Sequence, residues 1–126
     1  MKGKPMDPLK EAQYNQALII VTSNLKNCLN FQDKFPEGSA QTSLLRNRIK
    51  ALSIAQILLK QNLDLSVEPT TISKDDLIES LTPLNAIIHK CEKAQPKSNP
   101  GSSNELRLSK LIFAMNICIE LINDKL

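Results

Sequence analysis

The sequence predicts an all-α protein folded as an antiparallel up-down-up-down four-helix bundle. Along four long stretches, apolar residues recur at alternating spacings of three and four, which is typical of a helix with one buried face. Glycine is rare, with three in 126 residues, and the alternating runs that indicate strands are missing. Because the four stretches are joined by fairly short connections, neighbouring helices are expected to run antiparallel.

The length of 126 residues is enough for one hydrophobic core, so residues 1–126 are expected to form a single helical-bundle domain. Residues 1–6 are expected to be a flexible N-terminal segment. No signal peptide follows the basic start, and no apolar stretch approaches the roughly 20 residues that cross a bilayer, so no membrane span is predicted. Three cysteines, all within predicted helices, argue against a disulfide scaffold and favour a cytoplasmic location.

The first helix is expected over residues 8–33 and the second over residues 41–62. Asp7 supplies an N-cap acceptor, and Pro8 occupies the first turn, where its missing N–H costs nothing. The second helix has an inner face of Leu45, Ile49, Leu52, Ala55 and Leu59. In the longer connection that follows, at residues 63–72, Leu65 and Val67 are expected to pack against the end of the bundle.

The third helix is expected over residues 74–94 and the fourth over residues 103–125. Ser73 and Asp76 form a capping box before the third helix, and Ser102 and Glu105 form one before the fourth. The apolar rhythm continues across Pro83, which favours one helix bent at that proline. The alternative is two shorter helices, with Thr82 as a second N-cap.

The fourth helix carries a second apolar stripe besides its seam, and this stripe is the candidate interface: Leu106, Phe113, Ile117 and Leu121. Three interpretations compete. The helix is central in an irregular bundle and partly covered by the 63–72 connection, or it forms a homodimer interface, or it receives an amphipathic helix of another protein.

A candidate polar layer surrounds Arg48, which falls at the centre of the apolar face of the second helix. An arginine there is costly without a partner. In an up-down bundle Arg48 is level with Gln32, Glu92 and Glu105, so we expect it to pair with Glu92 or Glu105. The layer either fixes the helix register or forms, with His89, a small pocket for an anion.

No catalytic, cofactor-binding or metal site is predicted. The single histidine, His89, has no evident Ser-His-acid constellation around it, and phosphate-loop and metal motifs are missing. Cys28, Cys91 and Cys118 are too spread out to share a metal and are interpreted as buried free thiols; a redox or ligand role for Cys28 and Cys91 is the alternative. The net charge of +3 is mild, and a basic recognition helix is missing, so nucleic acid is not predicted as a partner.

These observations favour a small, non-enzymatic, cytoplasmic protein that binds a protein partner or forms a homodimer through its last helix. The alternative is a bundle that binds a small ligand or anion in a polar pocket around Arg48 and Glu92. An enzyme comes third, because its chemistry would have to be supplied by a cofactor or partner that the sequence does not indicate.

Overall fold

The structure is a computed structural model that describes residues 7–65 and 71–126, and within these ranges it contains helices and no strand. Its four long helices pack against each other: α1 (Pro8–Phe31), α2 (Ala40–Asn62), α3 (Lys74–Ala94) and α4 (Ser103–Lys125). Short 3-10 helices, η1 (Gln32–Lys34) and η2 (Gln95–Lys97), follow α1 and α3. The all-α fold class with four helices is therefore confirmed. The N-terminal segment expected to be flexible, residues 1–6, lies outside the described residues.

The helix bounds follow from side-chain caps. The residue before each long helix accepts a hydrogen bond from a backbone N–H two or three residues further on, at 3.0 to 3.3 Å, and these caps are Asp7, Ser39, Ser73 and Ser102. Such caps satisfy donors that have no partner in the first turn of a helix. The helix α3 runs unbroken through Pro83, as the favoured interpretation predicted, although a bend there is not confirmed.

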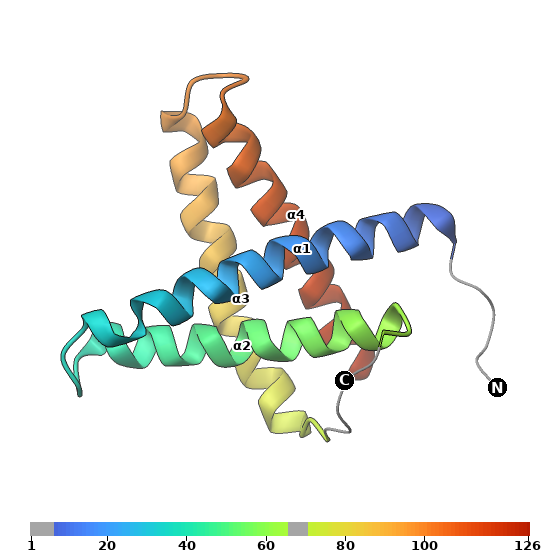
Figure 1. Cartoon of the computed structure of the whole chain (residues 1–126), viewed down its shortest axis with the longest axis horizontal. Helices are drawn as coiled ribbons and strands as arrows, with labels where there is room; N and C mark the ends of the chain where they lie inside the picture. Colours follow the sequence, from blue (N-terminus) through green and yellow to red (C-terminus); the bar gives the residue numbers. More distant parts are fainter. Residues whose placement is uncertain (1–6, 66–70) are drawn as a thin grey trace.

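The up-down-up-down arrangement is not confirmed, because the four helices form two antiparallel hairpins that lie across each other (Figure 1). In one hairpin α1 packs along α2, and in the other α3 packs along α4. Small, fully buried side chains, namely Ala17, Ala51, Ala55 and Ala114, allow helices to approach closely at a crossing. A periodic apolar seam predicts that a helix has a buried face, but it does not set the angle to its neighbour.

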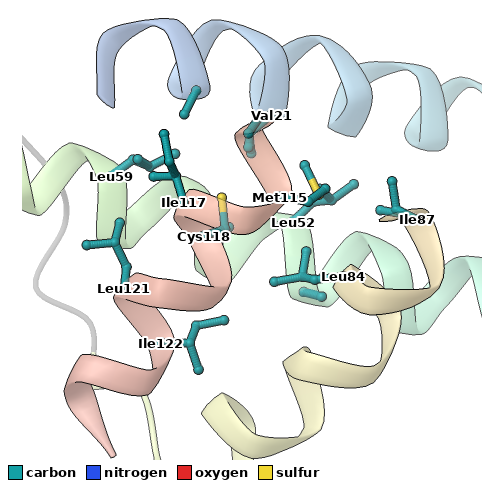
Figure 2. Packing of buried hydrophobic residues seen from close by; sticks show 14 of the residues in the cluster. Val21, Leu52, Leu59, Leu84, Ile87, Met115, Ile117, Cys118, Leu121 and Ile122 are labelled. Carbon is teal, nitrogen blue, oxygen red and sulfur yellow. The ribbon is translucent and has the colours of Figure 1, made fainter. Parts of the chain in front are cut away.

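The core lies where the two hairpins meet, and α4 contributes to it from more than one side (Figure 2). Met115, Cys118 and Ile122 of its seam are fully buried. Ile117 and Leu121 are also in the core, on the side of α4 that faces Leu59 of α2. The helix α4 packs against each of the other three long helices, and Ile117 and Leu121 of its second stripe are among its buried residues.

Of the 63–72 connection, Leu63 and Ile72 pack against the core. Leu65 was predicted to pack against the end of the bundle, but it is exposed. Val67 lies among residues 66–70, outside the described residues. The helix α4 also packs against α1, α2 and α3.

The far end of the first hairpin extends past the second hairpin (Figure 1). We call residues 29–47, which comprise the end of α1, the turn and the start of α2, the arm. None of its residues is buried, and it exposes four large apolar side chains: Leu29, Phe31, Phe35 and Leu44. The crossed arrangement accounts for much of this exposure, although α3 reaches the last residues of the arm, where Leu44 and Asn47 line a pocket together with residues of α3.

Candidate functional site

The structure divides the candidate interface on α4 into a buried part and an exposed part. Ile117 and Leu121 are only 8% and 5% exposed, and Phe113 is half-buried against the core. Leu106, near the beginning of α4, is 56% exposed. The four residues therefore do not form one open surface, since the neighbouring helices cover the C-terminal half of the stripe. Of the four, Leu106 is the one most able to contact a partner without a change in the core.

Leu106 belongs to a groove of about 410 Å³ between α1 and the N-terminal half of α4. These two helices belong to different hairpins and diverge from the place where they cross (Figure 1). Ile19 on α1, 65% exposed, and Leu106 on α4 are its exposed large apolar side chains, while Ile20 and Leu111 are half-buried. The candidate interface did not include Ile19, because its position beside α4 depends on the crossing of the hairpins.

The charged residues that line this groove are Arg107 and Lys110, and no acidic residue of the described chain joins them. The Arg107 guanidinium donates a hydrogen bond to the Asn104 side-chain oxygen at 2.9 Å, within α4. The other polar lining residues are uncharged: Gln16, Ser23, Asn24, Asn27 and Ser103. The groove therefore combines apolar contact surface with positive charge supplied by α4.

The predicted pairing of Arg48 with a carboxylate is not formed. Within the described ranges, no carboxylate oxygen lies within the 4.0 Å ion-pair distance of the half-buried Arg48 guanidinium. Glu92 and Gln32 are exposed, and the Glu105 carboxylate accepts a hydrogen bond from the Gly101 N–H at 3.0 Å. The prediction of this layer assumed that all four helices run alongside one another. In crossed hairpins, residues at the same distance along two helices no longer lie next to each other.

Arg48 instead lines a small cavity to which all four helices contribute, together with Asn24, Lys90, Cys91 and Arg107. Neither Glu92 nor His89 lines this cavity, although both were expected beside the arginine. The polar pocket that the sequence suggested around Arg48 and Glu92 thus has a different composition, with basic residues in place of the carboxylate.

The three cysteines are free and buried. Burial raises the pKa of each thiol, and it raises that of Cys118, in the centre of the core, to about 12. The positive charge of Arg48 lowers the pKa of both Cys28 and Cys91, against the larger effect of burial. Within the described ranges, no group of three or more His, Cys, Asp or Glu side chains is placed to hold a metal ion.

The buried Cys118 thiol leads us to expect that the protein loses stability above pH 9. The thiol loses its proton near pH 9.0 in the unfolded chain and near pH 12 in the folded protein. Deprotonation therefore favours unfolding between these values, by on the order of 1 kcal/mol for each pH unit. Urea denaturation at a series of pH values measures this decline. The variant Cys118→Ala should show a shallower decline, and an unchanged slope would contradict the assignment.

Comparison of the chain with protein-family models, with curated proteins and with solved structures finds no match. No helix in the described part of the chain has both the length and the apolar character needed to cross a membrane. The chemistry of the groove and of the cavity is therefore the basis for a functional interpretation.

Proposed function

We propose that this protein is a small, non-enzymatic, cytoplasmic module that binds another protein through the groove between α1 and α4. The partner is an amphipathic helix with acidic residues beside its apolar stripe. The observation that supports this proposal is the combination of Ile19 and Leu106, two exposed apolar side chains on different helices, with a groove whose charged residues are both basic.

The apolar part of the groove fits the way in which one protein receives a helix of another. An amphipathic helix docks by placing apolar side chains, spaced three and four residues apart, into a groove between elements of its partner. Ile19 and Leu106 offer exposed surface for such side chains, and the half-buried Ile20 and Leu111 add apolar contact beneath them. Burial of these side chains on binding would supply the main favourable free energy.

The charges select the kind of partner. Arg107 and Lys110 would attract carboxylates beside the apolar stripe of a docking helix and repel a basic helix. They also disfavour a homodimer through this groove. In a symmetric dimer the same surface meets itself, which would bring the basic side chains of two copies together. An acidic partner of different sequence is therefore the favoured occupant.

The chemistry of the remaining residues supports a non-enzymatic role in the cytoplasm. The thiols are buried, and their pKa values are raised, so at neutral pH they are protonated and poor nucleophiles. The three free cysteines, none of which forms a disulfide, suit a reducing compartment.

Two synthetic amphipathic helices with the same leucine stripe provide the test, one flanked by glutamates and the other by lysines. We expect the glutamate peptide to bind, and the lysine peptide to bind at least about tenfold more weakly, which corresponds to about 1.4 kcal/mol. Leu106→Lys and Ile19→Lys should each weaken binding of the glutamate peptide by a similar factor. Isothermal titration calorimetry measures the affinities.

Leu44→Lys is the matched control, because Leu44 is 67% exposed, much like Ile19, but lies on the arm and does not line the groove. This variant should bind the glutamate peptide as the unmodified protein does. The proposal is wrong if neither peptide binds, if Leu44→Lys weakens binding as much as Leu106→Lys, or if light scattering shows a dimer that Leu106→Lys dissociates.

A further inference from the structure

The cavity that contains Arg48 adjoins the groove, with which it shares Asn24, Arg107 and Leu111, but the exposed side chains of Ile19 and Leu106 do not line it. It has a volume of about 290 Å³ and receives residues from each long helix, namely Asn24 of α1, Arg48 of α2, Lys90 and Cys91 of α3, and Arg107 of α4. Apolar side chains form the remainder of its wall: Ile87, Ala94, Leu108 and Leu111. Four helices thus converge on one small space that is partly apolar and partly polar.

The charged residues that line this cavity are Arg48, Lys90 and Arg107, and no carboxylate from the described ranges is among the lining residues. All three positive charges act on the same thiol, because each lowers the pKa of Cys91 against the effect of burial. Glu92 acts in the opposite direction on that pKa, and its influence is the smallest of those present. The three basic side chains therefore line one cavity, and no acidic residue of the described chain lines it with them.

Lys90 and Arg107 are exposed, so water and salt screen their repulsion, whereas the charge of the half-buried Arg48 is screened less. Arg48 and Lys90 form no ion pair with a carboxylate of the described chain, and the hydrogen bond of Arg107 goes to the neutral Asn104 side chain. The half-buried position of Arg48 and the apolar wall lower the local dielectric constant, which strengthens both the repulsion between the cations and their attraction for an anion.

We propose that this cavity binds a small oxyanion of the phosphate class. Arg48 and Arg107 present planar guanidinium groups that donate paired hydrogen bonds to phosphate oxygens, and Lys90 adds a point charge. The Asn24 amide, which lines the same cavity, offers a neutral donor. The volume exceeds that of a few water molecules, at about 30 Å³ each, so a phosphate group fits with some of its hydration. This inference does not rest on helix binding in the groove.

Calorimetric titration with inorganic pyrophosphate, at an ionic strength held constant with chloride, tests the site. We expect pyrophosphate to bind and Arg48→Gln to weaken it at least about tenfold. Arg46→Gln is the matched control, since it removes the same charge from the same helix at an exposed position that does not line the cavity. This control should change the affinity by less than about twofold, the effect of net charge alone.

Lys90→Gln is a second test variant, because Lys90 is exposed and its replacement leaves the core untouched. It should also weaken pyrophosphate binding, with an unchanged circular dichroism spectrum. In nuclear magnetic resonance spectra, the amide signals of Asn24 and Cys91 should shift on addition of pyrophosphate. The site is ruled out if pyrophosphate does not bind, or if Arg46→Gln weakens binding as strongly as Arg48→Gln.

Discussion

Replacing Ile117 with Lys should unfold the protein or lower its free energy of unfolding by at least about 3–5 kcal/mol. Ile117 is 8% exposed and lies in the core, so the substitution places an ammonium group among apolar side chains. Core packing would also be disrupted, because the longer lysine side chain does not fit the space of isoleucine. The same change at Leu106, which is 56% exposed, should alter the free energy of unfolding by less than about 0.5 kcal/mol.

Urea denaturation followed by circular dichroism compares the two variants with the unmodified protein. Both substitutions introduce the same residue on the same helix and within the same apolar stripe, so the helix propensity of lysine does not account for a difference between them. A folded Ile117→Lys variant of nearly unchanged stability would show that the second stripe is accessible along its whole length. In that case the interface of four residues would again be the favoured interpretation.

The second large effect is expected at the crossing of the hairpins, where Leu52 of α2 is fully buried. Leu52→Ala should lower the free energy of unfolding by about 2–5 kcal/mol, through lost apolar burial and the cavity that remains. Leu44→Ala, two turns earlier on the same helix, should cost less than about 0.5 kcal/mol, because Leu44 is 67% exposed. Thermal and urea denaturation measure the stability of both variants. Equal losses of unfolding free energy would contradict the position of the arm outside the core.

The helices were predictable because their signals are local. Ser73 and Ser102 accept hydrogen bonds from backbone N–H groups three residues ahead, and that pattern can be recognised in the sequence without knowledge of the neighbours. The continuity of α3 through Pro83 was likewise visible as an unbroken apolar rhythm. These features depend on residues within a few positions of one another, so no tertiary information is required.

The arrangement of the helices was not predictable in the same way, and every error in the candidate sites follows from it. Leu45 and Leu52 share the predicted inner face of α2, but Leu52 is fully buried, whereas Leu45, on the arm, is only partly buried against the core. Arg48 was expected beside Glu92 or Glu105 because an up-down bundle, with all four helices side by side, was assumed. Ile19 was not placed in the candidate interface for the same reason. Which residues are level with each other depends on the crossing of the hairpins, and periodicity does not encode this crossing.

The arm has a consequence for how the molecule opens. Because none of residues 29–47 is buried, loss of their helical hydrogen bonds from the turn inwards would disturb little of the core, chiefly the partial contact that Leu45 makes with it. Such local opening costs less free energy than global unfolding. We therefore expect the part of α2 in the arm and the part in the core to unfold as two cooperative units of different stability. We expect fluctuation to be concentrated in residues 40–47 of this helix and the remainder of the helix to share the stability of the whole fold.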